Sequence, residues 1–192
     1  MKNFLFIVLC LFVQLLYAQE EPNRQNIPFV KLGYGYFNAD QMIDGNILSG
    51  EIGLKLKNSY LVSLKMNFAD ALNDIANYPD FKDVTWNFVY SYKWLSLNLG
   101  YEFMTKNHRH SIIPMLGPFY STELKTTPTS DDNGMFMLDK YENQMVGVDI
   151  SLQYLYNFRN GISIGMNASG SLAYQYGPTY ISVLPIILMR LK

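Results

Sequence analysis

The chain has 192 residues, with 15 Lys and Arg against 16 Asp and Glu, so its formal net charge is −1. This near balance gives no basis for a nucleic-acid partner, which would need a strongly basic surface. The length suits a single domain, and a single cysteine excludes an intramolecular disulfide.

The first residues, MKNFLFIVLCLFVQLLYAQ, have the organisation of a secretory signal peptide. One cation, Lys2, precedes an apolar run over residues 4–16 that only Gln14 interrupts, and the small residue Ala18 follows. The run is too short for a spanning helix, which needs about 20 apolar residues. We therefore predict an exported protein whose signal peptide, residues 1–18, is cleaved after Ala18.

The single cysteine, Cys10, lies inside this apolar run and follows Leu9, whereas the cysteine of a lipoprotein signal follows a small residue. We expect neither lipidation nor thiol chemistry in the mature chain. Residues 19–26 are polar and contain a proline, which indicates an exposed lead-in. No linker-like stretch divides the rest, so we predict one folded domain over residues 27–192.

Beyond residue 26 the chain alternates apolar and polar residues with a period of two, the pattern of half-exposed β-strands. The longest alternating stretch, SGEIGLKLKNSYLVSLKMNF, covers residues 49–68 and keeps every even position from Ile52 onward apolar except Asn58. One strand of that length would be far longer than usual. We predict two strands on either side of a turn at residues 57–59.

A later alternating segment changes parity. Over residues 84–92 the apolar residues hold even positions, but over residues 95–103 they hold odd ones. A two-residue hairpin at Lys93 and Trp94 explains this change, and a β-bulge there is the alternative. With the hairpin the chain has nine segments, whereas single-chain bacterial barrels have an even number of strands. We therefore expect about eight strands, with ten as the alternative.

The charged positions decide which face of these strands meets water. A charge that faces lipid near the bilayer centre costs roughly 2–4 kcal/mol, whereas charges inside a barrel can pair. The long segments also match tilted membrane strands better than the short strands of a soluble sandwich. We therefore expect the apolar face to meet lipid. The residues expected to form a structural charge network in the lumen are Lys31, Glu51, Lys55, Lys65, Glu102, Asp149 and Arg190.

An eight-stranded barrel encloses roughly enough room for side chains alone. We therefore expect this charge network to plug the lumen. A narrow pore lined by the same charges is the alternative interpretation.

Segments such as GVDISLQYLYNF, GISIGMNASGSL and the final YISVLPIILMRLK, together with the leader, carry a resemblance to a known family. The chain is similar to the small outer-membrane β-barrels of Gram-negative bacteria, which include the OmpA-type transmembrane domain. The resemblance covers residues 27–192 and implies an all-β fold, a single antiparallel up-and-down transmembrane barrel in the cell outer membrane. It also implies outer-membrane lipid, lipopolysaccharide and the barrel-assembly machinery as partners. Family members often end in an aromatic residue, whereas this chain ends in Leu191 and Lys192.

The sequence NHRHS is the candidate for catalysis, because some outer-membrane barrels modify lipid A with His and Ser. A hydrolytic dyad needs the imidazole within hydrogen-bond reach of the hydroxyl. In a strand, the neighbours His110 and Ser111 point to opposite faces. We therefore predict no catalytic residue and interpret KNHRH, residues 106–110, as a turn.

No metal or cofactor site is predicted. His108 and His110 can share a face, but the spacing supplies no third ligand. Two acidic loops lack the fixed glycine and terminal glutamate of a calcium-binding loop. Their carboxylates are Asp70, Asp74, Asp80 and Asp83 in the first and Asp131, Asp132, Asp139 and Glu142 in the second.

We predict a non-enzymatic outer-membrane barrel with a structural, adhesive or partner-binding role. The longest loops, expected to be mobile at residues 69–82 and 123–143, are the candidate sites for an extracellular partner. The alternatives are an outer-membrane enzyme that modifies lipid, a narrow pore, and a soluble exported β-barrel that binds an apolar ligand.

Overall fold

The computed structural model describes residues 26–39, 43–57, 59–74, 87–130, 136–158, 160–174 and 177–191. The predicted signal peptide, residues 1–18, and residues 19–25 of the predicted lead-in lie outside this part of the chain. Within it, no helix is long and apolar enough to cross a membrane. The described chain consists of β-strands and the turns between them.

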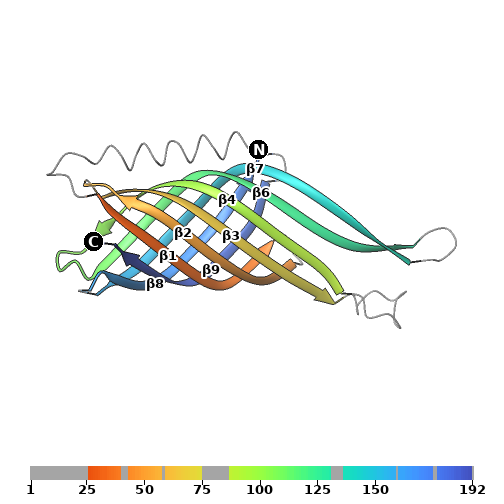
Figure 1. Cartoon of the computed structure of the whole chain (residues 1–192), viewed down its shortest axis with the longest axis horizontal. Helices are drawn as coiled ribbons and strands as arrows, with labels where there is room; N and C mark the ends of the chain where they lie inside the picture. The colour runs from red at the N-terminus through yellow and green to blue at the C-terminus, as the bar shows by residue number, and fades with distance from the viewer. Residues whose placement is uncertain are drawn as a thin grey trace.

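The strands run up and down a single antiparallel sheet (Figure 1). Their many β-branched and aromatic residues favour the pleated backbone. The elements are β1 (Ile27–Ala39), β2 (Ile43–Lys55), β3 (Tyr60–Asp74), β4 (Asn87–Tyr101), β5 (Phe103–Met104), β6 (His110–Ser130), β7 (Phe136–Asn157), β8 (Ile162–Ala173) and β9 (Gly177–Arg190).

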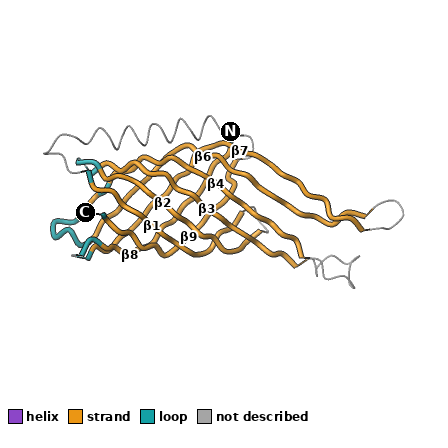
Figure 2. Tube along the Cα trace, in the orientation of Figure 1, coloured by secondary structure: helices purple, strands orange, loops and turns teal. Residues whose placement is uncertain are grey.

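The sheet closes on itself into a barrel (Figure 2). Neighbouring strands pair in the order β4-β3-β2-β1-β9-β8-β7-β6-β5, and β4 also pairs with β6. β5 continues β4 after a break at Glu102, because both pair with β6 in one register, with Gly100 opposite Met115 and Phe103 opposite Ile112. β4 and β5 therefore form one strand of the wall. The predicted antiparallel barrel of eight strands is confirmed.

The predicted hairpin at Lys93 and Trp94 is wrong, and so is the alternative bulge there. β4 runs straight through both residues and keeps a constant register with β3. The inward row changes instead from aromatic to small polar residues, in the order Tyr90, Tyr92, Trp94, Ser96 and Asn98. In the sequence, these buried aromatic residues look like lipid-facing apolar residues. They therefore suggest a change of parity, although the strand continues without a turn or a bulge.

Short turns connect neighbouring strands at one end of the barrel, which we call the short-turn end. In the turn after β2, Ser59 has φ 65° and its N–H donates to the carbonyl of Leu56 at 3.1 Å. The predicted division of the 49–68 stretch at residues 57–59 is therefore confirmed. The turn before β6 contains His108 at φ 57°. The turn before β8 contains Gly161 at φ 83°, where a glycine avoids the strain of the left-handed region.

The outer surface of the barrel is a belt of exposed apolar side chains. Leu99, Leu116 and Leu152 are 63%, 55% and 54% exposed, although they lie in paired wall strands. The inward positions of the same wall carry buried polar and charged side chains, such as Lys31 and Glu51. This distribution is the reverse of a soluble protein, and it is the arrangement of a transmembrane β-barrel whose apolar face meets lipid.

Aromatic side chains flank this belt at both ends. At the short-turn end the ring of Tyr101 lies edge-on to those of Tyr60 and Phe103, with centroids 5.2 Å and 4.7 Å apart. Towards the other end Tyr36 and Phe68 are exposed. Aromatic girdles of this kind mark the two membrane interfaces of outer-membrane barrels.

The predicted loops at residues 69–82 and 123–143 are wrong where the structure describes them. Residues 69–74 complete β3, and residues 123–130 and 136–143 belong to β6 and β7. Residues 75–82 and 131–135 lie outside the described part of the chain. The sequence misleads here because a strand with polar residues on both faces lacks the apolar alternation by which a lipid-facing strand is recognised.

A cation on the belt should destabilise the barrel. For Leu116→Arg we expect the free energy of unfolding to fall by about 2–4 kcal/mol, because the cation replaces a side chain that faces hydrocarbon. Gln144→Arg, at an exposed polar position beyond the pairing of β7 with β8, should change it by less than about 0.5 kcal/mol. Urea unfolding in lipid vesicles measures both variants. Equal, small effects would contradict a lipid-facing belt.

Candidate functional site

The lumen contains several ion pairs, and the first of them joins Lys31 and Glu51. These residues are cross-strand neighbours on β1 and β2, and both point inward because the two strands alternate in step. The Nζ of Lys31 lies 2.7 Å from Oε2 of Glu51, and both side chains are almost fully buried. The Lys31 Nζ also lies 5.3 Å from the centre of the Phe29 ring.

In the middle of the lumen Asp149 of β7 accepts three hydrogen bonds from other strands. Lys65 of β3 donates to Oδ2 at 2.8 Å, and the Ser96 hydroxyl of β4 donates to the same oxygen at 3.1 Å. The Tyr180 hydroxyl of β9 donates to Oδ1 at 2.7 Å. Since β3 and β7 are not neighbours in the sheet, the Lys65–Asp149 pair bridges the lumen from one wall to another.

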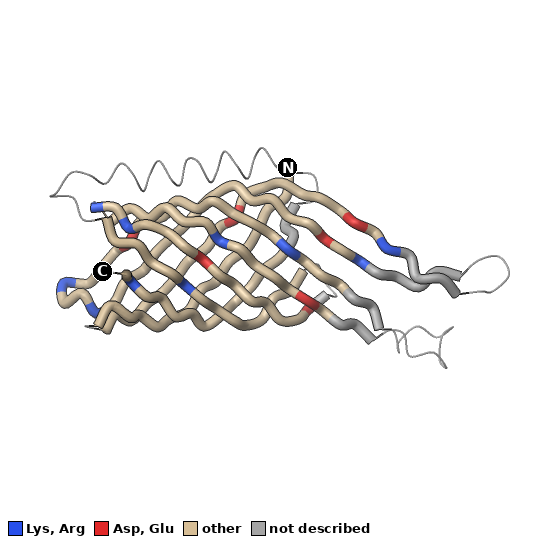
Figure 3. The backbone as a smooth tube through the Cα atoms, viewed as in Figure 1, with Lys and Arg blue, Asp and Glu red and all other residues tan. Residues whose placement is uncertain are grey.

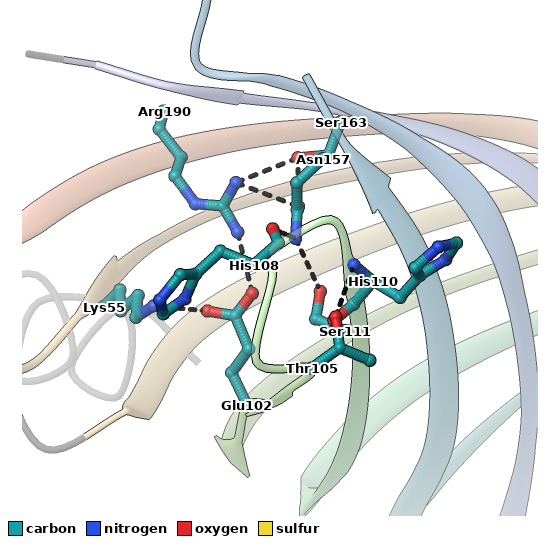
Figure 4. A network of polar contacts seen from close by, with 9 residues as sticks. All are labelled: Lys55, Glu102, Thr105, His108, His110, Ser111, Asn157, Ser163 and Arg190. Atoms are coloured by element: carbon teal, nitrogen blue, oxygen red, sulfur yellow. Dashed lines mark hydrogen bonds and ion pairs between the residues drawn. The ribbon is translucent and has the colours of Figure 1, made fainter. Parts of the chain in front are cut away.

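At the short-turn end two cations share one carboxylate (Figure 4). Lys55 of β2 lies 2.6 Å from Oε2 of Glu102, and Arg190 of β9 lies 2.8 Å from Oε1. The Arg190 guanidinium also donates to Asn157 Oδ1 at 3.2 Å and to Ser163 Oγ at 2.9 Å. The Glu102 side chain is fully buried, whereas those of Lys55 and Arg190 are partly exposed.

Towards the opposite end an aromatic cluster occupies the lumen. The rings of Trp94 and Tyr180 lie 4.3 Å apart, and Tyr92 packs on both at 5.0 Å and 6.0 Å. Tyr90 stacks on Tyr92 with centroids 6.2 Å apart. From the alternation over residues 84–92, Tyr90 and Tyr92 are predicted to face lipid. The signal that identifies them as inward is the unbroken even parity from Tyr92 to the polar Ser96 of the same strand.

The structure places all seven residues of the predicted charge network inside the barrel and joins them in four ion pairs. From the sequence we predict carboxylates such as Glu51 and Glu102 as the partners of Lys55 and Lys65. Lys55 does meet Glu102, but Lys65 pairs with Asp149 across the lumen instead of with its strand neighbour Glu51. Sequence alternation identifies the face of each of these charged residues, and it carries no information on pairs that cross the lumen.

His110 and Ser111 lie on opposite faces of β6. Nδ1 of His110 lies 2.7 Å from the hydroxyl of Tyr154, whereas Ser111 is buried and accepts a hydrogen bond from Asn157 Nδ2 at 3.3 Å. The two side chains therefore form no His–Ser dyad. Among the described residues, no group of three or more His, Cys, Asp or Glu side chains is placed to hold a metal ion.

β6 and β7 extend past the rest of the wall (Figure 1). The pairing of β6 with β4 ends at Lys125, and the pairing of β7 with β8 starts at Gly147. Beyond these points the two strands stay paired with each other, up to Ser130 opposite Phe136. We call residues 126–130 and 136–146 the projecting hairpin. Figure 3 shows positions of charged residues of both signs along this hairpin and along the strands of the barrel wall.

Comparison with known proteins identifies the fold. No protein-family model matches the chain, and no curated protein matches its sequence. The major outer membrane protein of Thermus thermophilus aligns with a TM-score of 0.64 at 14% identity, covering 87% of this chain and 100% of that one. The N-terminal β-barrel domain of Pseudomonas aeruginosa OprF aligns with a TM-score of 0.56 at 15% identity, covering 88% and 100%.

A further similar structure is that of Ail, the attachment invasion locus protein of Yersinia pestis, in complex with the heparin analogue sucrose octasulfate. It aligns with a TM-score of 0.53 at 12% identity, covering 87% of this chain and 99% of that one. Together with the apolar belt and the charges inside, this shared fold defines the class of the protein: it is a small outer-membrane β-barrel. The predicted resemblance, and the outer-membrane location that it implies, are confirmed at the level of the fold.

Removing the central carboxylate should cost far more than removing a neutral partner. For Asp149→Ala we expect the free energy of unfolding to fall by about 3–5 kcal/mol, because Lys65 is left buried without its counter-ion. Ser169→Ala removes one hydrogen bond, to Ser182, and should cost about 1 kcal/mol. The double variant Lys65→Met with Asp149→Leu should recover part of the loss, because no buried charge is left unpaired although Ser96 and Tyr180 still lose their acceptor. Urea unfolding measures all three, and similar values for the two alanine variants would contradict a buried ion pair.

Proposed function

We propose that the chain is a non-enzymatic outer-membrane barrel that holds a partner-binding hairpin at the cell surface. The observation that carries this proposal is the projecting hairpin. A tilted strand needs about 9–11 residues to span the membrane, whereas β6 and β7 have 21 and 22. The additional length therefore serves a purpose outside the bilayer.

The exposed surface of the projecting hairpin suits contact with a polypeptide. Five consecutive side chains of β7, from Lys140 to Gln144, are exposed and include a cation, an anion, a tyrosine and two amides. Outer-membrane barrels have short periplasmic turns and longer extracellular extensions. By this rule the hairpin points out of the cell, and the turns at residues 57–59, 105–109 and 158–161 point into the periplasm.

In this proposal the charge network has a structural role, and its side chains plug the lumen of the barrel. The Lys65–Asp149 pair crosses the middle of the lumen, the Glu102 cluster lies towards the short-turn end, and the aromatic cluster around Trp94 lies towards the other. This layered filling favours a plugged lumen over a narrow pore. The opposite faces of His110 and Ser111 likewise favour a non-enzymatic role over lipid modification.

The charges of the hairpin favour a polypeptide over a polyanion as the partner. Ail was solved with a heparin analogue, sucrose octasulfate. The segment 123–143 of this chain contains two lysines, and its five acidic residues give it a net charge of −3 by subtraction. A sulfated or phosphorylated polymer would be repelled by such a segment, whereas a polypeptide can present both signs of charge.

Loss of the hairpin should abolish binding without unfolding the barrel. Lys125 and Tyr141 already lie opposite each other, so Asn-Gly in place of residues 126–140 joins them by a two-residue hairpin turn. We expect the shortened chain to keep its heat-dependent gel mobility in detergent. On an array of extracellular proteins, we expect it to lose the spots that the full chain binds. Identical binding by both chains, or binding by neither, would contradict the proposal.

The two ends of the barrel should differ in their access from outside the cell. Lys140→Cys on the projecting hairpin should react with a membrane-impermeant maleimide on intact cells. Lys106→Cys in the opposite turn should react only after the outer membrane is permeabilised. The one native cysteine, Cys10, lies in the predicted signal peptide and should add no background. The reverse pattern of labelling would place the hairpin in the periplasm.

A further inference from the structure

We propose that the free edge of β7, residues 136–145, binds an extended segment of a partner protein as an additional antiparallel strand. This inference rests on the proposed function, because it names the part of the projecting hairpin that binds and the kind of partner that fits. Addition of a partner strand needs an edge whose backbone N–H and C=O groups are unpaired and which no device blocks. It also needs side chains on that edge that favour one partner sequence over another.

The free edge exists because β7 extends beyond the end of its neighbour β8. On one side β7 pairs with β6 over its whole length, from Phe136 to Tyr156. On the other side its pairing with β8 begins only at Gly147. Within the described part of the chain, no strand pairs with this second side of residues 136–145. An exposed row of backbone N–H and C=O groups is a template for another strand.

The hydrogen bond nearest the barrel shows which residues direct their backbone groups to the free side. The N–H of Tyr174 donates to the carbonyl of Val146 at 3.0 Å, so Val146 faces the β8 side. In an antiparallel strand every second residue directs both its N–H and its C=O to the same edge. Lys140, Glu142 and Gln144 therefore offer donors and acceptors at the free edge, whereas the odd residues bond to β6.

The opposite edge of the same hairpin is protected. β6 extends beyond its pairing with β4 only over residues 126–130, and Pro128 in that stretch has no N–H to donate. Proline and short length are two devices by which natural sheets block an edge. The free edge of β7 is longer and contains no proline. The β6 edge is therefore short and blocked by a proline, whereas the β7 edge can accept another strand.

The side chains on the free edge favour a particular order of charges in the partner. Lys140 and Glu142 are exposed, share one face of β7, and form no ion pair with another described residue. In an antiparallel partner strand, the residue opposite Glu142 comes two positions before the residue opposite Lys140. Opposite charges facing each other across strands stabilise the pairing. The fitting partner therefore carries a cation, any residue, and then an anion.

A second copy of the chain in the same membrane fits less well. Hairpins of two such copies project in the same direction, so their β7 edges meet parallel. In register, that arrangement places Lys140 opposite Lys140 and Glu142 opposite Glu142, which is repulsive. An extended segment of a separate protein can approach in either direction and so reaches the favourable antiparallel arrangement.

The order of charges can be tested with two synthetic peptides of one composition, TVTKTETVT and TVTETKTVT. Fluorescence anisotropy with the full chain in lipid nanodiscs should show about fivefold tighter binding of the first peptide. The double variant Lys140→Glu with Glu142→Lys should reverse this preference. Both substitutions lie on exposed side chains, so the barrel should keep its heat-dependent mobility. Equal binding of the two peptides by the native chain, or a preference that the double variant leaves unchanged, would overturn the proposal.

A backbone variant separates strand addition from simple charge attraction. Gln144→Pro removes one N–H from the free edge without removing a hydrogen bond to β6, and should weaken the preferred peptide about fivefold or more. Gln144→Ala, which keeps the N–H, should bind it like the native chain. Equal affinities for these two variants would overturn strand addition. If array binding by the native hairpin persists in that case, the proposed function stands and only its mode is wrong.

Discussion

In the hydrocarbon of a bilayer, every backbone N–H and C=O of a spanning strand must find its partner within the protein. This chain meets the requirement by closing its sheet through the β4–β6 and β1–β9 pairings. Closure divides every wall strand into a face towards lipid and a face towards the lumen, so the charges must pair inside. Beyond the β4–β6 and β7–β8 pairings, β6 and β7 stay paired with each other, and in the part of the chain that the structure describes no strand covers the second edge of β7 there.

The lumen network follows from closure, and three of its four ion pairs join strands that are not neighbours in the sheet. Glu102 binds Lys55 of β2 and Arg190 of β9, and Asp149 binds Lys65 of β3. Each pair fixes walls that the hydrogen-bonded ladder connects only through other strands. In the proposed plugged lumen, these pairs make the barrel a rigid support, which gives a projecting element a defined position and direction. The proposed binding role of the hairpin depends on that support.

Alternation in the sequence, together with the length of its segments and the leader, is sufficient to predict an antiparallel membrane barrel. Alternation also predicts the division at residues 57–59 and the face of each charged lumen residue. It fails where a side chain breaks the rule of apolar outside and polar inside. Tyr90, Tyr92 and Trp94 are aromatic yet buried in the lumen, so the alternation predicts a hairpin within β4 that does not exist. The paired polar strands over residues 123–130 and 136–143 likewise have the sequence pattern of loops. The Lys65–Asp149 pair depends on the curvature of the closed sheet, which no local pattern encodes.

Membrane extraction is the direct test of whether the apolar face of the strands meets lipid. Membranes from cells producing the chain are washed with carbonate or urea and then run on gels in detergent, with and without heating. If this face meets lipid, the protein stays in the membrane pellet, and its mobility changes on heating as the closed barrel unfolds. Release of the folded chain into the wash would contradict contact with lipid, and would point instead to an exported soluble barrel.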